Sequence, residues 1–255
     1  MPIEANIYYF AHGGEGEEGE ENTVVLVHGA GGTHLYWPAE IRRLPGYRTL
    51  AVDLPGHGKS GGHGMQSISG YADSLREWMD AIRLEKAAFV GHSMGSAVIL
   101  RLALENPGRV SALGLIGAGA RLRVNPEIFT YMENEATFQK GIDAIVQGSF
   151  SPHTPPELVD LAASRMSEIR PGVLRGDFQA CDLFDVMESV FKIRQSTLIL
   201  CGAEDRMTPV RYSQYLSTHI PNSRLEIIPE AGHMVMLEKP QLVAGILKDF
   251  FDEVL

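Results

Sequence analysis

The chain has 255 residues, of which 44% are hydrophobic and 21% are charged, and these fractions are typical of a globular protein with a sizeable core. Its formal net charge of -10 disfavours contact with phosphate backbones and anionic lipids, so neither nucleic acid nor a membrane surface is an expected partner. No lysine or arginine precedes Arg42 and no apolar stretch is long enough to span a bilayer, so we expect a cytoplasmic protein.

Strand-like and helix-like patterns alternate through residues 1–120. Short apolar runs predict the strands, and longer runs with apolar residues at helical spacing predict the helices. The predicted strands are 7–11, 23–28, 48–52, 86–91 and 110–116, and the predicted helices are 71–84 and 94–105. This alternation is typical of a mostly parallel sheet flanked by helices.

The middle of the chain interrupts the alternation. Strand signals are missing from residues 121–194, where the sequence is helical and irregular. Strand and helix patterns then resume, with predicted strands at 197–201 and 224–228. We therefore predict a core formed by residues 1–120 and 195–255, with a helical cap or lid inserted after the strand at 110–116.

Two loops are interpreted as structural. The link between the first two predicted strands is rich in glycine and is expected to be a solvated acidic loop; its glutamates are Glu15, Glu17, Glu18, Glu20 and Glu21. The turn Asp53-Leu54-Pro55-Gly56-His57-Gly58-Lys59-Ser60 follows the predicted strand 48–52 and is expected to shape a loop near the functional site.

The pentapeptide Gly91-His92-Ser93-Met94-Gly95 carries the strongest functional signal. It lies between the apolar run 87–90 and the helix-like run 96–104, so a strand, a sharp turn and a helix place the serine at a corner. Flanking glycines remove the side chains that would collide across such a turn. The pattern predicts that Ser93 is a nucleophile at a strand-to-helix elbow.

A nucleophilic serine needs a base and a group that orients the base, and the chain offers both. Asp205 follows the predicted strand 197–201, and His233 follows the predicted strand 224–228. Ligand sites of parallel sheets lie at the carboxyl ends of the strands, where these loops would meet. Glu204 adjoins Asp205 and remains an alternative for the acid.

These motifs, in the order serine, acid, histidine, resemble those of the α/β-hydrolase superfamily over nearly the whole chain apart from the interior insertion. The resemblance implies a mostly parallel central sheet flanked by helices, with Ser93 as nucleophile, Asp205 as acid and His233 as base. It also implies an oxyanion hole formed by two backbone N–H groups. One belongs to Ala30, in the loop His28-Gly29-Ala30-Gly31-Gly32, and the other belongs to Met94.

The predicted substrate cleft is mainly apolar. Most apolar residues of residues 121–194 are expected to pack the cap onto the sheet, and the remainder to line an acyl pocket. The candidate substrate-binding residues are Leu35, Trp37, Phe129, Met132, Phe178 and Met234. We therefore predict a serine hydrolase that acts on small to medium, largely apolar carboxylic esters through a covalent acyl-enzyme.

This chemistry requires no cofactor and no metal. Cys181 and Cys201 lack the spacing of a metal site and do not form a disulfide framework, so both are expected to be reduced. We expect a monomer or a small homo-oligomer whose partner is a small-molecule ester.

Several alternatives share the same motifs. A serine at position 93 argues against the dehalogenases and epoxide hydrolases of this fold, which use a carboxylate nucleophile. Enol-lactonases, carbon-carbon bond hydrolases of aromatic degradation and cofactor-free haloperoxidases remain. A carbon-carbon hydrolase would need a cation for its dienoate acid, for which the candidates are Arg121, Arg123, Arg165 and Arg175. A small-molecule receptor with slow turnover is the alternative outside enzyme catalysis.

Overall fold

The computed structural model describes residues 3–13 and 22–255, and one mostly parallel sheet runs through this part of the chain. Its strands have the order β1-β2-β4-β3-β5-β6-β7-β8; β1 and β2 are antiparallel to their neighbours, and the other pairs are parallel. The strands are β1 (Ile3–Glu4), β2 (Ile7–His12), β3 (Thr23–Val27), β4 (Arg48–Asp53), β5 (Ala87–His92), β6 (Val110–Ile116), β7 (Ser196–Gly202) and β8 (Ser223–Ile228). The predicted acidic loop lies in residues 14–21, outside the described residues.

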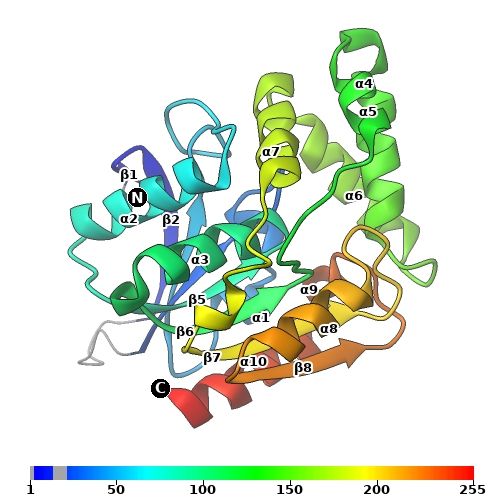
Figure 1. Ribbon diagram of the computed structural model, residues 1–255. Helices are drawn as coiled ribbons and strands as arrows, with labels where there is room; N and C mark the ends of the chain where they lie inside the picture. The colour runs from blue at the N-terminus through cyan, green and yellow to red at the C-terminus, as the bar shows by residue number, and fades with distance from the viewer. Residues whose placement is uncertain (1–2, 14–21) are drawn as a thin grey trace.

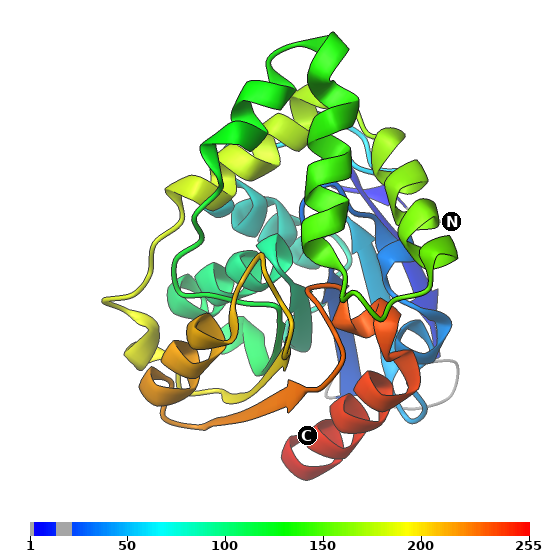
Figure 2. The ribbon, with the colours of Figure 1, turned by 90° about the vertical axis from the view of Figure 1, so that its right-hand side faces the viewer.

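Helices cover both faces of the sheet (Figures 1 and 2). Alternation of side chains along the strands explains this: Val25 and Val27 of β3 pack in the core beneath α2, α3 and α8, whereas Val24 and Leu26 pack beneath α1 and α10. These helices are α1 (Ala39–Arg42), α2 (Ile68–Ala81), α3 (Met94–Glu105), α8 (Val210–His219) and α10 (Pro240–Val254). Shorter elements are α9 (Val235–Glu238) and the 3₁₀ helices η2 (His34–Tyr36), η3 (Pro107–Arg109) and η4 (Val190–Lys192).

The register of the parallel strands brings their carboxyl ends to one level. Val27 of β3 pairs with Gly91 of β5, and Gly202 of β7 pairs with Ile228 of β8. The loops that follow these four strands therefore leave the sheet at the same edge, which is where parallel α/β sheets bind ligands.

Residues 121–194 form four helices between β6 and β7, and we call this segment the helical insertion. Its four α-helices lie at the top of the molecule in Figures 1 and 2. Its entry and exit run side by side, because the N–H of Val186 donates to the carbonyl of Ala120 over 2.8 Å. Its helices are α4 (Pro126–Met132), α5 (Glu135–Ser149), α6 (Pro156–Ser167) and α7 (Pro171–Leu183).

One predicted helix start differs from the observed one, because a capping residue sets where that helix begins. The helix predicted at 71–84 begins at Ile68, because the Ser67 hydroxyl accepts a hydrogen bond from the N–H of Gly70. The helix predicted at 94–105 coincides with α3.

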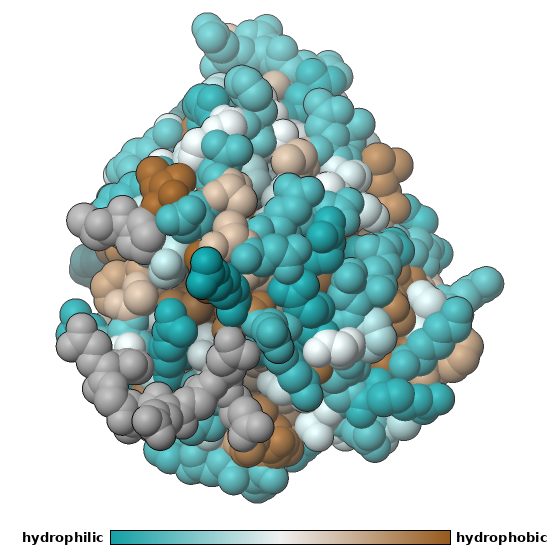
Figure 3. Space-filling model, turned by 90° about the vertical axis from the view of Figure 1, so that its left-hand side faces the viewer, coloured by the Kyte–Doolittle hydropathy of each residue, from teal (hydrophilic) through white to brown (hydrophobic). Residues whose placement is uncertain are grey.

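The surface is largely polar. Hydrophilic residues cover most of the face shown in Figure 3, and apolar residues form small separate patches there. Within residues 3–13 and 22–255, none of the helices combines the length and the apolar character needed to cross a membrane.

Candidate active site

Ser93 lies at the corner between β5 and α3 in a strained backbone conformation. Its φ of 52° and ψ of -115° are unfavourable for a residue with a side chain, and its N–H donates to the carbonyl of Ile116 over 2.8 Å. The turn requires glycine at both flanks: a Cβ on Gly95 would overlap the carbonyl oxygen of Val27, and one on Gly91 would lie 2.5 Å from the carbonyl of Gly95. The predicted elbow is therefore present.

Asp205 and His233 form a buried pair. The Nδ1–H of His233 donates to Oδ2 of Asp205 over 2.8 Å, which leaves Nε2 as the basic nitrogen. Thr208 adds two hydrogen bonds to the carboxylate, and the N–H of Met207 adds a third. Burial would raise the pKa of Asp205, but His233 and the Thr208 donors outweigh burial and lower this pKa, so the carboxylate is ionised.

Glu204 is directed elsewhere. Its Oε2 accepts a hydrogen bond of 2.6 Å from the hydroxyl of Ser151, which lies in the helical insertion between α5 and α6. Adjacent residues on the loop after β7 thus have different partners, and it is Asp205 that contacts His233.

Two residues outside the predicted catalytic set hold His233 in place. His92 donates from Nε2 to the carbonyl oxygen of His233 over 3.0 Å, and burial lowers the pKa of His92 to about 3, so this ring is neutral. Gly117 lies directly after β6 with a φ of 56°, and a Cβ there would lie 2.9 Å from Nδ1 of His233. Only glycine leaves room for the imidazole at this position.

The loop after β3 places a backbone donor beside Ser93. Gly29–Gly32 form a turn closed by a 3.1 Å hydrogen bond from the N–H of Gly32 to the carbonyl of Gly29, with Gly31 at a φ of 66°. Ala30 lines the same cavity as Ser93. Among the described residues, the N–H groups of Ala30 and of Met94, the first residue of α3, have no hydrogen-bond acceptor.

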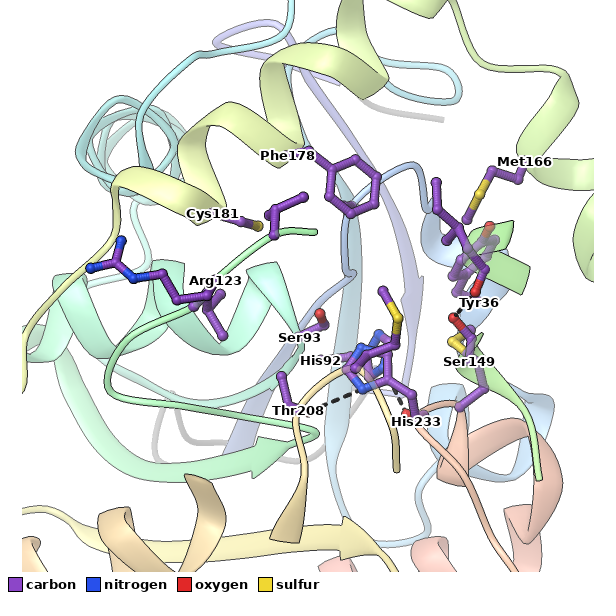
Figure 4. A pocket seen from close by; sticks show the side chains of 16 residues that line it. Tyr36, His92, Ser93, Arg123, Ser149, Met166, Phe178, Cys181, Thr208 and His233 are labelled. Carbon is purple, nitrogen blue, oxygen red and sulfur yellow. Dashed lines mark hydrogen bonds between the residues drawn. The ribbon is translucent and has the colours of Figure 1, made fainter. Parts of the chain in front are cut away.

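A cavity of about 70 Å³ lies between the sheet edge and the helical insertion, and Ser93 and His233 both line it (Figure 4). The core contributes Ala30, Tyr36, His92, Ser93, Met207, Thr208, His233 and Met234, and the insertion contributes Leu122, Arg123, Val124, Ile145, Ser149, Met166, Phe178 and Cys181. Most of these side chains are apolar, as the sequence predicted for the cleft.

The structure brings some of the candidate substrate-binding residues to this cavity and not others. Phe178 and Met234 belong to its lining. Trp37 and Met132 are buried in the core that includes α1 and α10, and Phe129 packs against that core. The Leu35 side chain is exposed. Its neighbour Tyr36 lines the cavity instead, because successive residues of η2 point in different directions.

Seven of the sixteen lining residues have polar side chains, namely Tyr36, His92, Ser93, Arg123, Ser149, Thr208 and His233. The hydroxyl of Tyr36 is buried and has no hydrogen-bond partner among the described residues. Burial raises the pKa of Tyr36, so the group is a phenol that retains its proton. Of the four candidate arginines, Arg123 belongs to the cavity lining, but its side chain is exposed and its guanidinium points away from Ser93 (Figure 4). Its Nη1 donates to the carbonyl of Asp182 over 2.9 Å. Arg121, Arg165 and Arg175 are also exposed and lie beside acidic residues.

Comparison with known proteins identifies the family. The model of the alpha/beta hydrolase fold matches residues 22–240. The chain belongs to the α/β-hydrolase family. The predicted fold class is thus confirmed, and a thermophilic esterase superposes on this α/β-hydrolase with a TM-score of 0.81 at 33% identity, covering 97% of this chain and 98% of the esterase.

Curated relatives of this α/β-hydrolase differ in the substrate that they are named for. A protein of Caulobacter sp. (strain K31) named for carbamate hydrolysis, RutD, is 28% identical over 96% of this chain and 95% of its own. The 2-hydroxy-6-oxononadienedioate/2-hydroxy-6-oxononatrienedioate hydrolase of Comamonas testosteroni is also 28% identical, over 92% of this chain and 89% of its own.

Proposed function

We propose that this α/β-hydrolase is a serine hydrolase of carboxylic esters, with Ser93 as nucleophile, His233 as base and Asp205 as the acid that orients the base. One observation carries the proposal: the strained Ser93 lines the same cavity as His233, whose Nδ1 is held by an ionised carboxylate. This arrangement leaves Nε2 of His233 free to accept the proton of a nucleophile.

The reaction proceeds in two covalent steps. Nε2 of His233 removes the hydroxyl proton of Ser93 as the serine oxygen attacks the ester carbonyl carbon, and Asp205 stabilises the imidazolium that forms. The N–H groups of Ala30 and Met94 donate to the oxyanion, and their lack of acceptors among the described residues supports this role. His233 then protonates the leaving alcohol, and a water activated by His233 releases the carboxylic acid from Ser93.

The size and the lining of the cavity favour a substrate with a small, largely apolar acyl group. Its volume of about 70 Å³ and its apolar lining suit a short acyl chain, and the esterase at 33% identity supports ester chemistry. Movement of the helical insertion, acting as a cap, would admit medium-sized esters. The Tyr36 hydroxyl supplies one hydrogen-bond donor for a polar group on the substrate.

Hydrolysis of p-nitrophenyl esters of increasing acyl length tests this function. We expect turnover that is highest for short acyl groups, and Ser93→Ala should lower kcat by on the order of 10⁴ while the protein remains folded. Turnover that survives in Ser93→Ala would contradict the assignment of the nucleophile.

Arg123 favours a second candidate, the cleavage of a carbon-carbon bond in a substrate that carries a carboxylate. Arg123 belongs to the cavity lining, with its guanidinium on the exposed outer side (Figure 4), and the relative from Comamonas testosteroni is named for such a substrate. To test this, the enzyme would be incubated with a dienoate acid of this class and consumption of the acid would be measured. Consumption of the acid with a KM that rises in Arg123→Gln would favour this function, whereas ester turnover without consumption of the acid would exclude it.

A further inference from the structure

Asp177, on α7 of the helical insertion, ties three segments of the core together. Its carboxylate is fully buried and accepts hydrogen bonds from the N–H of Gly31 over 2.9 Å, from Nε2 of His57 over 2.8 Å and from the hydroxyl of Tyr71 over 2.5 Å. These donors belong to the loop after β3, the loop after β4 and helix α2. One carboxylate from the insertion thus reaches the loop that carries Ala30.

The hydrogen bonds of His57 show that this contact is an ion pair. Nδ1 of His57 faces the carbonyl oxygen of Pro55 at 3.1 Å, and Nε2 faces the carboxylate of Asp177. Both partners are acceptors, so both ring nitrogens carry hydrogen and the ring is an imidazolium. Burial alone would lower the pKa of His57, but the nearby Asp177 outweighs burial and raises it.

The contact with Gly31 fixes the peptide next to the expected oxyanion donor. The hydrogen bond from Gly31 to Asp177 sets the orientation of the peptide that joins Ala30 to Gly31. Leu174 lies one turn before Asp177 on α7 and packs against Gly31. A Cβ on Gly31 would lie 2.7 Å from Cδ1 of Leu174. Helix α7 therefore holds this loop both by hydrogen bonding and by packing.

We propose that Asp177 is a positioning residue, which orients the N–H of Ala30 for the oxyanion and makes a complete oxyanion hole depend on docking of the helical insertion. The inference rests on the proposed function, because it assigns the donor role to Ala30. The insertion then does more than cover the cavity: an enzyme whose insertion has moved away loses part of its transition-state stabilisation. Hydrolysis is thereby coupled to a closed cavity.

The test compares substitutions at Asp177 with a matched control on the same helix. Asp182 also lies on α7 and accepts a backbone N–H, that of Val124, over 3.1 Å, but among the described residues its carboxylate accepts no hydrogen bond from the loop after β3. The variants are Asp177→Ala, Asp177→Asn and Asp182→Ala. For each we would measure kcat and KM for p-nitrophenyl acetate, the rate constant of Ser93 phosphonylation by a fluorophosphonate, and the thermal unfolding midpoint.

The proposal predicts a defect in kcat beyond any loss of stability. Asp177→Ala should lower kcat and the phosphonylation rate constant together by about tenfold or more with little change in KM, because both reactions place an oxygen in the oxyanion hole. Asp177→Asn retains one oxygen acceptor and should recover part of both rates. Asp182→Ala should keep both rates within about twofold of the unchanged protein, whatever its thermal midpoint.

Two results would overturn the proposal. One is an Asp177→Ala protein that is folded but less stable, with rates equal to those of Asp182→Ala, which would make Asp177 a structural anchor only. If Asp177→Ala does not fold, Asp177→Asn and Tyr71→Phe replace it, and rates equal to the control in both would have the same meaning. A wild-type protein that neither reacts with the fluorophosphonate nor hydrolyses the ester would instead reject the proposed function.

Discussion

Thr208 donates two hydrogen bonds to Asp205, one from its N–H to Oδ1 and one from its hydroxyl to Oδ2, and each is 2.8 Å long. The same hydroxyl lies 3.1 Å from Nδ1 of His233, so Thr208 contacts both members of the pair. Its position three residues after Asp205 lets the backbone and the side chain of one residue satisfy the carboxylate from the same turn.

Thr208→Val keeps the shape of this side chain and removes its hydroxyl. We expect kcat for ester hydrolysis to fall by about tenfold, because a hydrogen bond to a charged group contributes about 1.5–3 kcal/mol. Thr218→Val is the control, since the Thr218 hydroxyl is exposed and donates to the carbonyl of Gln214. Equal kcat values in the two variants would show that the hydroxyl of Thr208 does not support the pair.

Gly117→Ala should disturb His233 directly. The added Cβ would lie 2.9 Å from Nδ1 of His233. Gly62→Ala is a matched control, because Gly62 also has a positive φ, 74°, but its Cβ would meet open space. Both variants should lose about 1 kcal/mol of unfolding free energy from backbone strain, and Gly117→Ala alone should lose most of its kcat. Comparable kcat in the two variants would contradict the account.

Tyr36→Phe tests whether the unpartnered hydroxyl binds substrate. We would compare a p-nitrophenyl ester that carries a keto group on its acyl chain with the saturated ester of the same length. The variant should lower kcat/KM for the keto ester by about fivefold and leave the saturated ester unchanged, because one hydrogen bond contributes about 1 kcal/mol. An equal effect on both esters would mean that Tyr36 acts by shape alone.

The pair of His57 and Asp177 predicts a stability that depends on pH. The pKa of His57 is raised in the folded protein, so its stabilisation is complete below its ordinary pKa of about 6.5 and disappears as the pH rises through the raised value. Asp177 and Asp53 favour the charged ring, while burial and His28 oppose it. Urea unfolding of the wild type and of His57→Gln should therefore give a difference in unfolding free energy that shrinks with rising pH. A difference that is constant from pH 6 to pH 10 would contradict the ion pair.

Cys181 and Cys201 are both free and buried. Burial raises the pKa of both thiols, that of Cys201 to about 11, so few thiolates exist near neutral pH. A thiol reagent at pH 8 should react with neither cysteine in the native protein and with both after unfolding in urea. Rapid reaction of the native protein would contradict the burial of these residues.

The strand ends and the residues that follow them were predictable from the sequence. Ser93, Asp205 and His233 each follow a short apolar run and lie beside glycine or in a polar turn, and these signals are local. A parallel sheet then brings its strand ends to one edge whatever the details of packing. The structure accordingly places Asp205 against His233, and both Ser93 and His233 at one cavity.

The lining of the cavity was less predictable because apolar residues suit a core and a cavity equally. Trp37 and Phe178 are both buried in the same apolar core, yet Phe178 also lines the cavity and Trp37 does not. Asp177 gave no local signal, since its partners His57 and Gly31 are 120 and 146 positions away in the chain. Such contacts depend on how α7 docks, which no short-range pattern encodes.

Trapping of the covalent intermediate would identify the nucleophile. The enzyme would be mixed with excess p-nitrophenyl acetate, quenched in acid during turnover and digested for mass spectrometry. We expect an acetyl adduct on the peptide that contains Ser93, and no adduct on this peptide in Ser93→Ala. An adduct on another residue, or hydrolysis by Ser93→Ala at the wild-type rate, would contradict the proposal that Ser93 is the nucleophile.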